Sequence, residues 1–151
     1  MLQPGTRAPE FTLPDETGAP RSLRELLADG PLILYFYPAD FTPGCTREAC
    51  SIRDIHADIL AAGLRVVGVS PQDGDSHRKF RDEYGLPFSL LSDEDKVVVR
   101  AYDVDGPFGV GVRRVTYLIG RDGEIRDALQ ADILVGRHTS FIENAMRLRS
   151  A

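Results

Sequence analysis

The sequence predicts an α/β domain in which helices flank a central mixed β-sheet. The apolar run 32–37 lacks polar alternation, as expected of a central strand covered on both faces, and residues 64–70 predict a second strand. An amphipathic segment of helical period separates them, so the second strand should lie parallel to the first. Two later runs, 113–119 and 124–129, flank Gly-Arg-Asp-Gly at 120–123, which predicts an antiparallel hairpin. A length of 151 residues suits one domain over 1–151.

The N-terminal segment, residues 1–20, is rich in Pro, Gly, Thr and acids and is expected to be mostly loop. Residues 11–13 (Phe-Thr-Leu) are expected to form a short edge strand. Ser22 followed three residues later by Glu25 has the pattern of a capping box and predicts a short helix. Gly30 and the proline after it end that helix before the first central strand.

The middle of the chain alternates predicted helices and strands. Residues 71–75 turn the chain after the second central strand, and a helix carrying His77, Phe80 and Tyr84 should end at Gly85. A short strand is expected over 88–91. The run Ser-Asp-Glu-Asp at 92–95 should cap a further helix with acids in its first turn, as the helix dipole favours.

The last part of the chain contains a loop, the hairpin and one helix. Residues 103–112 are rich in Gly and Asp and predict the loop. The final helix is expected to begin near Thr139 or Ser140. Its buried face should consist of Phe141, Ile142, Ala145 and Met146.

The stretch between the first central strand and the long helix, residues 38–50, carries the most specific signal. Thr42 suits a helix N-cap, and Pro43 suits the first helical position, where its missing N–H costs nothing. Cys45 then lies at the third helical position, beside free backbone N–H groups and the positive end of the dipole. A thiol placed there is expected to ionise more readily than a free thiol.

The two cysteines are predicted to lie on different sides of this helix. The predicted buried face contains Ala49, Ile52, Ile55, His56, Ile59 and Leu60, and Cys45 lies near its centre. Cys50 lies about 140° away on the outer side. Five residues of helix separate the Cα atoms by roughly 8–9 Å, whereas a disulfide tolerates no more than about 7 Å. A Cys45–Cys50 bond therefore requires the first turns of the helix to unwind.

The pattern Pro38-x-x-x-Thr42-x-x-Cys45 resembles the active-site motif of the peroxiredoxins. The wider run Tyr-Phe-Tyr-Pro…Thr-Pro-Gly-Cys-Thr-x-x-x-Cys looks like the branch called bacterioferritin comigratory protein or peroxiredoxin Q. The resemblance implies a thioredoxin-like fold, which the predicted order of elements also fits. It implies a peroxidase in which Cys45 attacks hydrogen peroxide or an alkyl hydroperoxide and becomes a sulfenic acid. Cys50 would then resolve this acid as an intramolecular disulfide.

The same resemblance implies roles for the neighbours of Cys45. The hydroxyl of Thr42 and the backbone N–H of Gly44 would supply hydrogen bonds at the peroxide. Pro38 would shield the sulfur from water, although the sequence alone favours a simpler role in ending the strand. Glu48 would shape the site, although a solvated acid in the first turns is also compatible with its position. Phe41 would wall the pocket or simply pack.

A cation beside the sulfur is also implied. The family carries Arg-x-Ser/Thr-aromatic on the strand that faces the cysteine helix, and Arg114-Val115-Thr116-Tyr117 fits that pattern. Arg113 precedes it, and strand alternation allows only one of the two arginines to face Cys45. The register of the motif favours Arg114. If neither faces the sulfur, both are solvated arginines at the strand edge.

The histidines give no second activating group by spacing alone. His56 shares the face of Cys45 but lies about 16 Å along the helix axis, so it cannot act as a base for that sulfur. The spacing of His77 and His138 permits such a role, but no pattern supports one. Two cysteines and three scattered histidines also provide no metal-ligand set. No cofactor is predicted, because Gly106, Gly109 and Gly111 lack the strand–helix context of a dinucleotide site.

Bulk properties narrow the function further. The composition, 42% hydrophobic and 27% charged, is ordinary for a soluble globular protein, and the net charge of −5 argues against a nucleic-acid surface. No apolar run approaches the roughly 20 residues that span a bilayer, and the sequence shows no apolar leader. A cytoplasmic protein is expected. The resemblance implies a monomer that is reduced by thioredoxin or a similar dithiol.

Two other interpretations remain open at this point. A thiol–disulfide oxidoreductase would use the same fold, but such proteins carry C-x-x-C rather than C-x4-C. A non-enzymatic redox sensor or partner-binding module would be oxidised stoichiometrically without sustained turnover.

Overall fold

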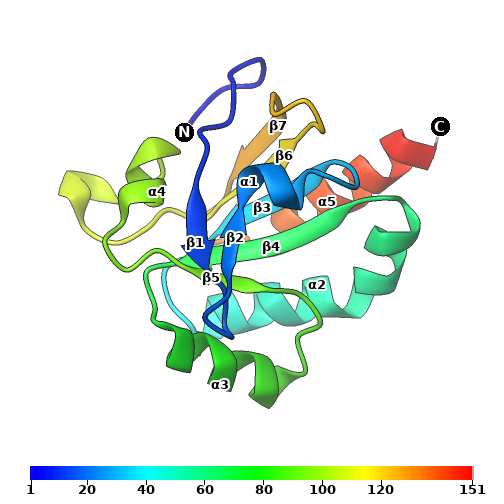
Figure 1. The fold of residues 1–151 in the computed structure, drawn as a ribbon. Helices are drawn as coiled ribbons and strands as arrows, with labels where there is room; N and C mark the ends of the chain where they lie inside the picture. The colour runs from blue at the N-terminus through cyan, green and yellow to red at the C-terminus, as the bar shows by residue number, and fades with distance from the viewer. Residues whose placement is uncertain (151) are drawn as a thin grey trace.

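A computed structural model describes residues 1–150 and places a five-stranded sheet at the centre of the molecule (Figure 1). The strand order is β5-β4-β3-β6-β7. β3 and β4 are parallel, as are β4 and β5, whereas β6 pairs antiparallel with both β3 and β7. The mixed sheet, the parallel pair and the hairpin are therefore confirmed. The strands are β3 (Leu32–Phe36), β4 (Arg65–Ser70), β5 (Leu90–Ser92), β6 (Val115–Ile119) and β7 (Ile125–Gln130).

Helices connect these strands and cover the sheet. Figure 1 shows α2 and α3 together on one side of the sheet and the N-terminal strands on the other. The side chain of Ser22 accepts a hydrogen bond from the Glu25 N–H at 3.1 Å, so the predicted N-cap of α1 is confirmed. The helices are α1 (Leu23–Leu26), α2 (Pro43–Ala61), α3 (Gly74–Tyr84), α4 (Val97–Ala101), α5 (Gly136–Ser150) and a 3-10 turn, Pro107–Gly109.

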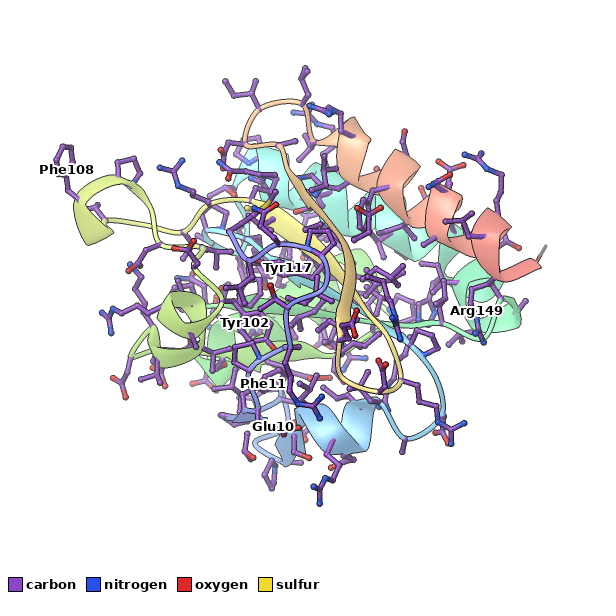
Figure 2. The ribbon with its side chains drawn as sticks, turned by 90° about the horizontal axis from the view of Figure 1, so that it is seen from above. Glu10, Phe11, Tyr102, Phe108, Tyr117 and Arg149 are labelled. Atoms are coloured by element: carbon purple, nitrogen blue, oxygen red, sulfur yellow. The ribbon has the colours of Figure 1, made fainter. Side chains whose placement is uncertain are left out.

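The central strand β3 is buried on both faces and divides the core into two clusters. Ile33 and Tyr35 enter a cluster beneath α2, α3 and α5. The alternate side chains of β3 enter a second cluster on the other face. Figure 2 shows Phe11, Tyr102 and Tyr117 gathered in that second cluster, whereas Phe108 points outward from a loop. The hydroxyl of Tyr117 donates to the Tyr102 carbonyl at 2.6 Å, so the buried phenol is satisfied.

The N-terminal segment contains more strand than predicted. The strand expected over 11–13 is β1 (Thr12–Pro14), and it pairs with β2 (Pro20–Ser22), which was not predicted. The two form a separate antiparallel sheet rather than an edge of the main one. Asp15 accepts the N–H groups of Thr17 and Ala19 and so closes the turn between them.

Two predicted helix starts are wrong. The acids at 92–95 precede α4 rather than occupying its first turn, because Lys96 adopts a left-handed φ of 59° immediately before Val97. The carboxylate of Asp93 still accepts the Val99 N–H at 2.7 Å and caps the helix from outside. α5 begins at Gly136, before the predicted Thr139 or Ser140, because the buried side chain of His138 holds its first turn.

The predicted buried face of α2 is confirmed at Ala49, Ile52 and Ile59, but Ile55 and His56 are only half-buried and Leu60 is wrong. Ile52 and Ile59 are fully buried and lie two turns apart, whereas Leu60 is 54% exposed. Leu60 lies on the flank of the helix, about 100° around the axis from Ile59. The face of α2 that contacts the sheet is therefore narrower than the sequence pattern predicts.

Candidate active site

The first turn of α2 forms where the sequence predicts it. Thr42 has the extended backbone of an N-cap, with φ −72° and ψ 149°, and Pro43 is the first helical residue. The expected hydrogen bond from a helix N–H to the Thr42 hydroxyl is absent, which corrects the prediction. That hydroxyl instead donates to the Ala39 carbonyl at 3.1 Å, because the chain reverses direction between the two residues. The helix N-terminus therefore keeps backbone N–H groups for a ligand.

The two cysteines have different surroundings in one unbroken helix. Cys45 is 2% exposed and belongs to the core cluster beneath α2, whereas Cys50 is half-buried. Both are free thiols. Because α2 runs from Pro43 to Ala61 without interruption, the sulfurs are kept apart as the helical geometry predicts.

Arg114 is the arginine that lies against Cys45. Its Nη2 is 3.3 Å from the sulfur and its Nη1 donates to Glu48 Oε1 at 2.8 Å. The backbone N–H of Arg114 donates to Asp132 Oδ1 at 2.8 Å, which fixes the residue just before β6. Burial alone would lower the pKa of Arg114, but the adjacent Glu48 and Cys45 raise it, so the guanidinium stays charged. Arg113 is half-buried and has no side-chain contact of this kind with the cysteine.

Glu48 is buried beside this pair, so the solvated position considered for it is wrong. It is 1% exposed and pairs with Arg114 on the inner side of α2. Burial raises the pKa of Glu48 to about 7, against the opposing effect of Arg114. The carboxyl therefore changes charge near neutral pH, in direct contact with the cation that faces the sulfur.

Three further predicted residues surround the start of α2. A side chain at Gly44 would place its Cβ 3.2 Å from Arg114 Nη2, so the glycine makes room for the guanidinium. Phe41 is 47% exposed, has a left-handed φ of 66°, and its ring lies 5.1 Å from that of Phe80. Pro38 is half-buried where the chain leaves β3.

A buried polar cluster that the sequence did not indicate anchors the preceding loop. Asp40 Oδ2 is 2.7 Å from His77 Nδ1 and accepts a hydrogen bond from Ser76 Oγ at 2.7 Å. Its other oxygen accepts from the hydroxyl of Tyr37 at 2.6 Å. His77 Nε2 donates to the Leu91 carbonyl at 3.0 Å. The residue before Phe41 is thus fixed to α3 and to the end of β3.

His138 is the second site residue that spacing did not reveal. It is fully buried, and its Nδ1 lies 2.7 Å from the hydroxyl of Thr116 and 3.6 Å from Glu48 Oε2. His56 lies elsewhere on α2, with its ring 6.0 Å from that of Phe88, in agreement with its exclusion as a base. Among residues 1–150 no group of three or more His, Cys, Asp or Glu side chains is arranged to hold a metal ion.

None of the helices within residues 1–150 has both the length and the apolarity that crossing a membrane requires.

Cysteine-based redox enzymes of the thioredoxin fold present a reactive sulfur at the start of a helix, and this fold and site define such a protein. The model of the AhpC/TSA family matches residues 4–128, and the chain belongs to that family, the peroxiredoxins. It is similar to the putative peroxiredoxin bcp of Coxiella burnetii, with 43% identity over 147 residues that cover 93% of this chain and 96% of the relative. It is a thiol peroxidase of the bacterioferritin comigratory protein or peroxiredoxin Q branch.

Solved structures support the same assignment. The crystal structure of peroxidoxin BcpB from Mycobacterium tuberculosis matches with a TM-score of 0.92 and 34% identity over 98% of both chains. The bacterioferritin comigratory protein of Xanthomonas campestris, studied for its alkyl peroxide reduction activity, matches with a TM-score of 0.84 and 30% identity, covering 93% of this chain and 92% of that one. The chain spans 56% of the length of the chloroplastic peroxiredoxin Q of Arabidopsis thaliana, to which it is 44% identical. The predicted thioredoxin-like fold is confirmed.

Proposed function

We propose that the chain reduces hydrogen peroxide and alkyl hydroperoxides with Cys45 as the attacking sulfur and Cys50 as the resolving one. The observation that carries this proposal is the 3.3 Å contact between Arg114 Nη2 and Cys45 Sγ at the first turn of α2. A guanidinium and a helix N-terminus both favour the thiolate, which is the nucleophile in such chemistry. The alkyl peroxide activity of the Xanthomonas relative supports the substrate class.

The first step consumes the peroxide. The Cys45 thiolate attacks the terminal oxygen, an S–O bond forms, and the O–O bond breaks. The leaving alkoxide or hydroxide takes up a proton and departs as alcohol or water, and the sulfur is left as a sulfenic acid. Backbone N–H groups of Gly44 and Cys45, together with Arg114, supply donors for the charge that develops on oxygen. The hydroxyl of Thr42 keeps free lone pairs for the peroxide O–H, while Pro38 and Phe41 border the site.

The second step requires α2 to open. Cys50 attacks the sulfenic sulfur, water leaves, and the Cys45–Cys50 disulfide forms within one chain. Because about 8–9 Å of helix separates the two Cα atoms, the turns between them must unwind first. A dithiol protein such as thioredoxin then returns two electrons by thiol–disulfide exchange. Both cysteines come from one helix, which supports action as a monomer, and thioredoxin-type reduction supports a place in the reducing cytoplasm.

Mass spectrometry after one equivalent of peroxide tests both roles. The wild-type protein is expected to lose two hydrogens as the disulfide forms, and Cys50→Ser is expected to gain one oxygen on Cys45. Cys45→Ser is expected to show neither change on this timescale. Undiminished thioredoxin-dependent turnover in Cys50→Ser would exclude Cys50 as the resolving residue. Oxidation without sustained turnover in the wild-type protein would favour a redox sensor instead.

A further inference from the structure

The imidazole of His138 is held in one orientation by three groups from other elements. Its Nε2 lies 2.9 Å from the carbonyl oxygen of Ala131, which can only accept, so Nε2 carries a hydrogen. Its Nδ1 lies 2.7 Å from the hydroxyl of Thr116 on β6 and 3.6 Å from Glu48 Oε2 on α2. One ring nitrogen therefore serves as the anchor, and the other faces both a hydroxyl and the carboxyl of the site.

The hydrogen bonds around Nδ1 leave Glu48 short of a donor. A neutral imidazole accepts the hydrogen of Thr116 at Nδ1 and has nothing to donate to the carboxyl. Glu48 Oε2 is accordingly buried without a hydrogen-bond partner among the described residues, whereas Oε1 accepts from Arg114. A buried carboxylate oxygen without a donor favours the protonated form of the acid.

The groups that face His138 favour its neutral form on balance. Burial lowers the pKa of His138, and Arg114 and Arg137 lower it further, against the Ala131 carbonyl and Asp132. Tyr35 on β3 also interacts electrostatically with Glu48, and burial raises the pKa of its phenol well above the usual range, so it stays neutral. The imidazole is therefore neutral at pH 7, where Glu48 titrates.

We propose that His138 is a positioning residue for Cys45, which it influences through Glu48 and Arg114 without touching the reacting atoms. An ionised Glu48 draws the guanidinium toward itself and repels a thiolate across it. A protonated Glu48 is neutral and does not compete for the guanidinium, so the positive charge of Arg114 stabilises the thiolate of Cys45. His138 Nδ1 accepts the hydrogen of the Thr116 hydroxyl and offers no hydrogen to Glu48. The protonated form of that carboxyl is therefore favoured, and with it the thiolate form of Cys45.

The proposal rests on Cys45 being the reactive sulfur, but its test uses alkylation rather than peroxide turnover. In a Cys50→Ser background Cys45 is the only thiol in the sequence, and the pH dependence of its reaction with iodoacetamide reports its thiolate. His138→Asn offers an amide donor to Glu48, so alkylation at pH 7 should slow about 3- to 10-fold and its pH midpoint should rise. Thr116→Val frees Nδ1 of His138 to accept a hydrogen bond from protonated Glu48. This favours the protonated carboxyl, so the pH midpoint of Cys45 alkylation should fall.

A second background separates this effect from structural damage. Glu48→Gln cannot ionise, so neither His138→Asn nor Thr116→Val should move the midpoint when combined with it. His56→Asn, on the same helix but away from Glu48, should leave the midpoint unchanged. Equal shifts with and without the Glu48→Gln substitution, or an unchanged midpoint in a folded variant that retains Glu48, would overturn the proposal. If His138→Asn does not fold, the isosteric Thr116→Val decides the question alone. Loss of peroxide oxidation with a normal alkylation profile would instead count against the proposed function.

Discussion

The two halves of α2 are held by different kinds of contact. In the first half, residues 43–50, Arg114 bridges the sulfur of Cys45 and the carboxylate of Glu48, and Ala49 adds only a small apolar side chain to the core. In the second half, residues 51–61, the contacts to the sheet are apolar, and Ile52 and Ile59 are fully buried in the core cluster. Ion pairs and hydrogen bonds can be exchanged for contacts with water, whereas apolar burial is lost only by exposing the side chain.

This difference limits how far the helix needs to open. Disulfide formation requires the first turns of the helix, up to Cys50, to unwind, and these lie in the polar half. Asp40, just before that half, is fixed to His77 and Tyr37, and Ile52, just after it, is fixed in the core. The segment that must open is therefore bounded on both sides by residues held in buried contacts.

The largest expected effect comes from breaking the apolar half. Ile52→Ala should lower the free energy of unfolding by about 2–5 kcal/mol, because it removes a fully buried side chain and leaves a cavity. The rate of Cys45 oxidation by peroxide should change less than about twofold under conditions where the protein is folded. Urea titration and stopped-flow oxidation measure the two quantities. Leu60→Ala, on the exposed flank, should change stability by less than about 0.5 kcal/mol. A fall in oxidation rate that tracks the lost stability would show that the halves are not independent.

The next largest effect concerns the polar half. Arg114→Gln should slow the oxidation of Cys45 by about 10²–10³-fold, because it removes the charged donor beside the sulfur. Arg113→Gln is the matched control, since its side chain has no such contact with the cysteine, and its rate should stay near that of the wild type. Single-turnover oxidation with excess peroxide measures both. Equal losses in the two variants would argue against a specific role for Arg114.

A pH-dependent effect of intermediate size should come from Glu48. Its pKa in the folded protein is raised from 4.5 to about 7, so the folded state keeps a proton that the unfolded state has already released. The free energy of unfolding should therefore fall by about 1–3 kcal/mol as the pH rises from about 5 to 7. Glu48→Gln should remove this part of the slope, and Asp58→Asn, exposed on the same helix, should not. Urea titrations across this pH range measure the free energy of unfolding. An identical pH dependence in the wild type and Glu48→Gln would show that Glu48 is not the group responsible.

The features of the fold and site that the sequence predicts are those set by residues close together in the chain. The start of α2 depends on Thr42 and Pro43, which are local, and it formed where predicted. The non-alternating run of β3 likewise predicted a strand that is buried on both faces. The contact of Arg114 with Cys45 joins residues 69 positions apart, and it was predicted only from the resemblance to a family motif.

The parts that could not be predicted depend on tertiary packing. Asp40 and His77 lie 37 positions apart, and nothing in the spacing of either indicates a pair. His138 meets Thr116 and Glu48 only after β6, α2 and α5 have packed together. The early start of α5 has the same cause, because it is set by where His138 is buried rather than by a local cap. Glu48 was ambiguous because a helical wheel places it on the flank, where either burial or exposure fits.

The smallest predicted effect separates the two steps of the reaction within the polar half. Gly44→Ala should stiffen the first turn of α2 by about 0.5–1 kcal/mol, since alanine loses less backbone freedom in a helix. If that turn must open before Cys50 can reach Cys45, disulfide closure after oxidation should slow about two- to fivefold. The added Cβ also meets Arg114 Nη2 at 3.2 Å, so the bimolecular oxidation step should slow as well.

Gly74→Ala is the matched control, because it lies in the first turn of α3 with open space around its Cβ. Both rates should match those of the wild type in that variant. Rapid quenching at timed intervals after peroxide addition, followed by mass spectrometry, resolves the sulfenic acid from the disulfide. Closure that is as fast or faster in Gly44→Ala would contradict the prediction that a stiffer first turn delays the disulfide.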